Sequence, residues 1–147
     1  MVPFVVLLIA LLLFRGLGLF GVVAFATWQL SATYALAVLF LFVALSHFGK
    51  MKEDLVKMVP RSLPYPRQLV YLTGVLEILG AIGLLLPATR MAAAYCLAAL
   101  LVVMYPANVN ASRHQIPLRG KKPTPFWLRL FMQLVYIGLA VWIGVAS

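Results

Sequence analysis

The sequence has few charged residues and few side chains of the kind that carry out chemistry. Only 10% of its 147 residues are charged, and only three are acidic. Cys96 is the one cysteine, which excludes an intramolecular disulfide and a CxxC redox pair, so we interpret it as a packing residue. Two histidines, His47 and His114, lie without a second ligand at metal-binding spacing, so we expect no metal site. The sequence also contains no P-loop, dinucleotide-binding motif or Ser-His-Asp arrangement, and hydrolytic chemistry is therefore not indicated.

Apolar residues dominate the composition instead. They make up 65% of the chain, with a mean hydropathy of +1.05, whereas an ordinary soluble domain is about 45–50% apolar. Several apolar runs approach the ~20 residues that a helix needs to cross a bilayer. The composition therefore predicts an all-α membrane protein, a compact bundle of transmembrane helices that forms a single domain over residues 1–147.

Five apolar runs are candidate transmembrane helices. The first contains Arg15 and has no basic segment ahead of it, so we expect a retained helix rather than a removable signal peptide. Whether this first run forms one full span stays open. Residues 49–59 show apolar residues at three- and four-residue spacing, which predicts a short amphipathic helix on the membrane surface. The predicted spans cover residues 2–27, 30–48, 67–86, 90–106 and 126–146.

Basic residues are distributed unevenly between the loops. With five spans, loops 49–67 and 107–129 lie on one side of the membrane and contain ten of the twelve Lys and Arg residues. The other side contains only Arg90. The positive-inside rule predicts that the basic loops are cytoplasmic, in a plasma membrane or bacterial inner membrane. Because the basic residues lie between apolar spans, we expect their partners to be lipid headgroups and not nucleic acid.

Glu77 is the one acidic residue inside a predicted span. At helical spacing it shares a face with Gly74, Gly80 and Ala81, so we expect it to point into the bundle. An ionisable side chain at this depth is costly unless it is protonated, paired or bound to a ligand. A functional site and a purely structural carboxylate both remain open.

Arg15 is the expected counter-charge of Glu77. Counting residues from the membrane surface places Glu77 roughly 15 Å deep and Arg15 roughly 18 Å deep, at 1.5 Å per residue. Our hypothesis is an Arg15–Glu77 pair, either direct or through a shared ligand, which would relieve the cost of burying both charges. The alternative is that Arg15 extends toward the headgroups or marks a helix break.

Three further polar residues complete the candidate buried network. His47 lies at the end of the second span, and counting residues places it near the membrane surface. There we expect it to cap the helix; the alternative is that it binds a ligand or carries a proton. Asn108 is expected to cap the fourth span or stabilise a turn. Gln133 is expected to hydrogen-bond between helices. No catalytic residue can be assigned.

Five short segments share their order and spacing with a known family. They are SHF at 46–48, MVPRSLPYP at 58–66, LTGVLEILGAIGLLLPATR at 72–90, MYPAN at 104–108 and WLRLFMQ at 127–133. Through them the chain resembles the DoxX/DoxX-like family of small bacterial membrane proteins. The resemblance implies a core of about four helices, with the N-terminal span as an addition. It also implies that the characteristic family positions are His47, Pro64, Pro66, Gly74, Glu77, Pro106 and Asn108.

Two kinds of function follow from this resemblance. The family takes its name from a membrane subunit associated with an archaeal thiosulfate:quinone oxidoreductase, and a distant eukaryotic relative helps to assemble receptor channels. The first reading is a redox-associated subunit that binds a quinone or another lipophilic ligand between its helices and receives electrons from a partner protein. The second is a non-catalytic chaperone or assembly factor for another membrane protein. We expect no independent catalytic activity under either reading.

Overall fold

The protein is built from helices. The computed structural model describes all 147 residues, and its only β-type contact is an isolated bridge between Leu118 and Lys121. In chain order the elements are α1 (Val2–Leu19), the 3-10 helix η1 (Val23–Phe25), α2 (Trp28–Phe48), α3 (Lys52–Met58), α4 (Pro66–Leu85), α5 (Arg90–Arg113) and α6 (Phe126–Val145). The prediction of an all-α bundle is confirmed.

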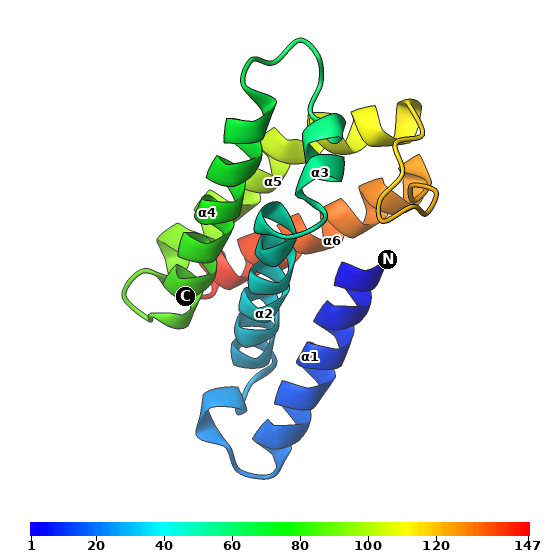
Figure 1. Ribbon diagram of the computed structural model, residues 1–147. Coiled ribbons are helices and arrows are strands. Elements are labelled where there is room, and N and C mark those ends of the chain that lie inside the picture. The colour runs from blue at the N-terminus through cyan, green and yellow to red at the C-terminus, as the bar shows by residue number, and fades with distance from the viewer.

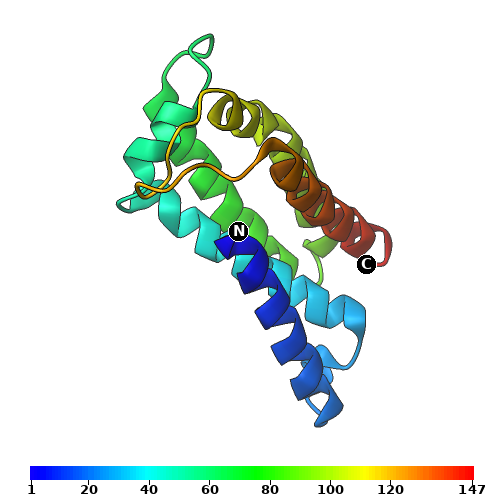
Figure 2. The ribbon, with the colours of Figure 1, turned by 90° about the vertical axis from the view of Figure 1, so that its right-hand side faces the viewer.

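Helix α2 is the central element of the bundle (Figure 1). It packs most extensively on α4 and α1 and also contacts α6, while α5 lies between α4 and α6. Helices α2, α4, α5 and α6 therefore close a four-helix core, and α1 lies outside it against α2 (Figure 2). The sequence of α2 explains its position, because the consecutive residues Ala35, Leu36 and Ala37 are all buried and point to different sides of the helix.

Helices α1, α2, α4, α5 and α6 are each long and apolar enough to cross a membrane. Many of their outward-facing side chains are large and apolar, among them Leu12, Leu79 and Val103. Such a surface suits hydrocarbon rather than water. The chain is therefore a multi-pass membrane protein.

The connection between α1 and α2 corrects the expected span of residues 2–27. Helix α1 ends at Leu19, and Gly21 has φ of 98°, a backbone conformation that favours glycine. A Cβ atom on Gly18 would lie only 1.9 Å from the carbonyl oxygen of Phe25. The glycines thus allow a tight turn, and the first helix covers only residues 2–19.

Helix α5 is longer than the predicted span of residues 90–106. It continues through Pro106 to Arg113, although proline lacks the amide hydrogen for the bond to the carbonyl four residues earlier. Proline is tolerated in a transmembrane helix when neighbouring groups bind the carbonyls that it disturbs. The carbonyl that loses this bond is that of Val102. The carbonyl of the preceding residue, Leu101, accepts a hydrogen bond from Gln133 Nε2 on α6 at 2.5 Å. The expectation that Gln133 bonds between helices is confirmed.

The basic loops gather at one end of the bundle, around α3 (Figure 1). Asn110 donates to the carbonyl of Met58 at the end of α3, and the Arg119 amide donates to Asp54 within α3. Arg67 at the start of α4 makes a two-bond ion pair with Glu53, at 2.7 and 3.0 Å. These hydrogen bonds hold the pKa of the Glu53 carboxyl below its usual value.

Candidate functional site

Glu77 and His47 form a buried acid–imidazole pair between α4 and α2. The Nε2 atom of His47 lies 3.4 Å from Oε2 of Glu77, and the two side chains are only 4% and 2% exposed. That distance is slightly longer than a full hydrogen bond, and Glu77 Oε2 has no hydrogen-bond partner within the protein. The pair therefore places an incompletely satisfied carboxylate oxygen inside the apolar bundle.

The other ring nitrogen of His47 fixes the protonation pattern of this pair. His47 Nδ1 lies 2.7 Å from the carbonyl oxygen of Val70, which can only accept, so Nδ1 carries a hydrogen. The Thr73 hydroxyl oxygen also lies 3.2 Å from Nδ1, and its one hydrogen is within bonding distance of the carbonyls of Leu69 and Val70, each 3.0 Å away. His47 Nε2 therefore faces Glu77 either as the free acceptor of a neutral ring or as the second N–H of a charged ring.

One proton is needed between Nε2 and the carboxyl group. If neither group carried it, two acceptors would face each other in a dry site, and the carboxylate would be a bare buried charge. The proton resides either on Glu77, which leaves both groups neutral, or on His47, which makes an ion pair. Both arrangements have zero net charge, and this explains how a carboxyl group is accommodated in a membrane-spanning helix.

The small residues of α4 make this close approach possible. A Cβ atom on Gly74 would lie 2.7 Å from Cβ of His47 and 3.0 Å from Cε2 of Phe48. Gly74, Glu77, Gly80 and Ala81 are all buried, which confirms the expected inward face. Gly74 is therefore the residue that lets α2 place its histidine against α4, one turn from the acid.

Depth counting separated His47 from Glu77, and the structure corrects that expectation. His47 near the end of α2 lies beside Gly74, which is well inside α4. Helix α4 thus begins farther out than the point where α2 ends, and residue counts from the two helix ends do not start at the same level. His47 is a member of the buried pair rather than a helix cap.

Arg15 is not the partner of Glu77, so the direct Arg15–Glu77 pair is wrong. Its Nη1 donates to the carbonyl of Ala26 at 3.3 Å, and its guanidinium lies 5.3 Å from the ring centroid of Trp28. Trp28 is the first residue of α2 and His47 is close to the last, so about 28 Å of helix separates Arg15 from the buried pair. Arg15 instead stabilises the α1–α2 turn. It lies close to the end of α1, as the alternative interpretation of Arg15 as the mark of a helix break expected.

Asn108 belongs to a separate contact. Its Oδ1 accepts a hydrogen bond from Arg129 Nη1 at 3.0 Å, which joins α5 to the first turn of α6. Asn108 is thus neither a helix cap nor part of the Glu77 pair, because α5 continues past it. Gln133 likewise bonds to Leu101 rather than to the pair. Of the five candidates, the structure brings together only Glu77 and His47.

Sequence reasoning missed the contribution of Thr73 and of the Val70 carbonyl. Thr73 lies four residues before Glu77, and this spacing places the two on one helix face. That spacing was the available signal, whereas the Val70 carbonyl has no sequence signature. A buried hydroxyl without a partner, that of Tyr136 on α6, was also not singled out.

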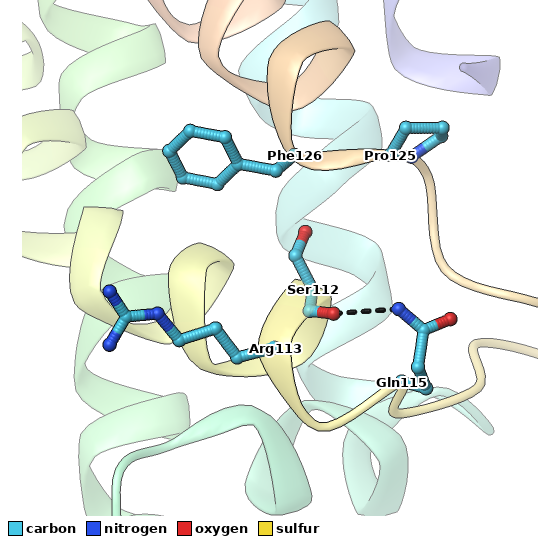
Figure 3. A pocket seen from close by; sticks show the side chains of 5 residues that line it. All are labelled: Ser112, Arg113, Gln115, Pro125 and Phe126. Carbon is cyan, nitrogen blue, oxygen red and sulfur yellow. Dashed lines mark hydrogen bonds between the residues drawn. The ribbon is translucent and has the colours of Figure 1, made fainter.

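Two hollows lie away from the buried pair. One is at the basic end, where Ser112, Arg113, Gln115, Pro125 and Phe126 surround it (Figure 3). The other is an apolar groove between α1 and α2, lined by Val6, Ile9, Ala10, Leu13, Phe14 and Val38. Neither is lined by Glu77 or His47. Because both of these side chains are almost completely buried, a ligand reaches the pair only if neighbouring side chains move.

The fold and the buried pair define a class: a small all-helical, multi-pass membrane protein with one Glu–His pair in its core. Residues 36–144 match the family described as a domain of unknown function (DUF8561), and the chain belongs to that family. The matched region begins within α2 and contains both members of the pair, whereas α1 lies outside it. No curated protein and no solved structure matches the chain.

Proposed function

We propose that the protein is a redox-associated membrane subunit that binds a quinone, or a lipophilic ligand with a similar carbonyl group, beside Glu77 and His47. The observation that carries this proposal is the unpartnered Oε2 of Glu77, held 3.4 Å from a histidine in an otherwise apolar bundle. An ionisable group at such a position is a functional-site candidate by default.

The pair suits a carbonyl ligand because it has a hydrogen to donate. A quinone carbonyl accepts hydrogen bonds, and a protonated Glu77 would turn its O–H away from His47 Nε2, 3.4 Å distant, to donate one to this carbonyl. A bound quinone supplies two-electron, two-proton redox chemistry, and a partner protein supplies the electrons. The Glu77–His47 pair would supply one of these two protons, and water would supply the other and reprotonate the pair. Val70 and Thr73 keep the His47 ring oriented.

Phe48 is the candidate entrance to this site. Its ring lies against Gly74 and stacks on Tyr71 with centroids 5.7 Å apart, and 42% of the residue is exposed on the bundle surface. A rotation of this ring opens the α2–α4 seam next to His47. A lipophilic ligand would then enter from the hydrocarbon region rather than from water.

The resemblance to the DoxX/DoxX-like family supports the redox assignment, since His47 and Glu77 are among the positions that carry it. The charge distribution supports a cytoplasmic location for the basic end, because ten of the twelve Lys and Arg residues lie there. Arg15 and Arg90 are the two basic residues at the other end, so the excess of positive charge at the basic end remains large. A plasma membrane or bacterial inner membrane is the proposed location.

Quinone binding to the purified full-length protein in lipid nanodiscs tests the proposal. Glu77→Leu removes the donor, and Leu79→Ala is the control, because Leu79 is 59% exposed and lies on the lipid side of the same helix. We expect decylubiquinone to bind Glu77→Leu about tenfold more weakly than wild type, the factor for one lost hydrogen bond in a dry site. Equal binding by wild type and Glu77→Leu, with both variants folded by circular dichroism, would refute the proposal.

An assembly factor for another membrane protein is the second candidate. The specific observation is α1, in which only Leu7 and Ala10 are buried and a long apolar surface faces outward. Mass spectrometry of the complex extracted from native membranes separates the two functions. A retained quinone supports the redox subunit, and a stoichiometric membrane protein without quinone supports the assembly factor.

A further inference from the structure

The hollow at the basic end is lined by one arginine, two other polar residues, a proline and a phenylalanine. It lies between the end of α5 and the start of α6, and Ser112, Arg113, Gln115, Pro125 and Phe126 line it. In Figure 3, Phe126 and Arg113 extend to the same side, and Gln115 lies across the hollow from them. The Gln115 amide donates to the Ser112 carbonyl at 2.8 Å, which holds this side chain in place.

Arg113 has no carboxylate to pair with inside the protein. The chain contains three acidic residues, and each is engaged elsewhere: Glu77 with His47, Asp54 with Lys57, and Glu53 with Arg67. An exposed guanidinium with five donors at the rim of a hollow is suited to phosphate oxygens, which it binds through two parallel hydrogen bonds.

The surroundings supply further donors for an anion. Helix α6 begins at Phe126 after Pro125, and no side chain caps it, so its first amide groups are free. These amides and the positive end of the helix dipole add to the attraction of Arg113 for a phosphate.

An apolar stripe continues from the hollow into the membrane. Val109, Pro106 and Val102 precede Arg113 on the same face of α5, since they lie four, seven and eleven residues before it. Val102 is 58% exposed. Hydrogen-bond donors for a phosphate at the helix end, with an apolar surface next to them, match a phospholipid. Free phosphate would make no contact with the apolar stripe.

We propose that this hollow binds the phosphate headgroup of one anionic phospholipid, whose acyl chains lie along the Arg113–Val102 face of α5. Arg113 binds the phosphate, and the free amides at the start of α6 assist. The site is separate from the Glu77–His47 pair and does not depend on the function proposed for that pair.

Native mass spectrometry of the detergent-solubilised full chain tests this inference, with phosphatidylglycerol as the probe and phosphatidylcholine as the neutral comparison. Arg113→Gln is the test variant. Arg61→Gln is the matched control, because it removes the same charge from an exposed loop at the same end of the bundle. We expect one phosphatidylglycerol to bind wild type and Arg61→Gln equally, and Arg113→Gln about fivefold more weakly, which corresponds to about 1 kcal/mol per basic residue near a membrane.

Two outcomes would overturn the proposal. Equal losses in Arg113→Gln and Arg61→Gln would show a diffuse charge effect without a site. Displacement of the lipid by millimolar inorganic phosphate would show an anion site that does not select a lipid. Arg113→Lys keeps the charge and controls for misfolding. Its affinity for phosphatidylglycerol should lie between those of wild type and Arg113→Gln. If a folded Arg113→Lys bound the lipid as weakly as Arg113→Gln, this would also contradict an electrostatic site.

Discussion

Replacing Gly74 by alanine is the sharpest test of how the buried pair is assembled. The new methyl carbon would lie 2.7 Å from Cβ of His47, an atom that no side-chain rotation can move away. Ordinary contacts begin near 3.4 Å, so α2 and α4 have to separate by about 0.7 Å. The His47–Glu77 distance, already 3.4 Å, then increases beyond the range in which a proton is shared.

The expected free-energy change follows from two opposing terms. Overpacking a tight contact costs typically about 1–3 kcal/mol, and alanine is about 0.8–1 kcal/mol better than glycine in a helix. We expect Gly74→Ala to lower the free energy of unfolding by up to about 2 kcal/mol. Gly138→Ala is the control, because a Cβ there meets nothing within 4 Å, and only the helix-forming gain of up to about 1 kcal/mol remains.

Unfolding in mixed micelles with increasing dodecyl sulfate, followed by far-ultraviolet circular dichroism, measures both variants. Both variants share the helix-forming gain, so they should differ by the overpacking cost of about 1–3 kcal/mol, with Gly74→Ala the less stable. A Gly74→Ala protein as stable as Gly138→Ala would refute the close packing of α2 on α4 at this glycine.

Three other substitutions test contacts elsewhere in the protein, and the dodecyl sulfate assay measures the stability of the first two. Gln133→Leu removes the bond to the Leu101 carbonyl and should cost about 0.6–1.7 kcal/mol; no loss would mean that the carbonyl near Pro106 needs no partner. Arg15→Met removes the hydrogen bond to Ala26 and the contact with Trp28, and it should lower the free energy of unfolding by about 1 kcal/mol. Quinone binding at Glu77 should not change. Weaker quinone binding would support a link between Arg15 and Glu77 after all. The Arg67 hydrogen bonds make the pKa of Glu53 lower in the folded protein than in the unfolded chain. The pair therefore stabilises the fold fully above the pKa of the unfolded chain, and this stabilisation is lost as the pH falls through the pKa of the folded protein. The melting-temperature difference between wild type and Glu53→Gln should therefore shrink on acidification from pH 6 to 3, and a difference that grows would contradict this.

The long apolar runs and the inward face of Glu77 could be predicted from the sequence because both depend on short-range periodicity. Helix ends were harder to predict, since glycines in the α1–α2 turn end a helix inside an apolar run, and α5 continues through Pro106 although proline commonly ends a helix. The partner of Glu77 could not be predicted by depth. That calculation assumes that all helices begin at one membrane level, whereas α4 begins well before the level of His47.

The neutral Glu77–His47 pair also has an electrical consequence. When its proton moves between the two side chains, one charge travels no more than about 3.4 Å, about a tenth of a hydrocarbon layer ~30 Å thick. A membrane potential of 100 mV acts on a full crossing with about 2.3 kcal/mol, so it changes this transfer by at most about 0.3 kcal/mol. The proton's position is therefore governed by what touches the pair, and the site responds to a ligand while remaining nearly insensitive to voltage.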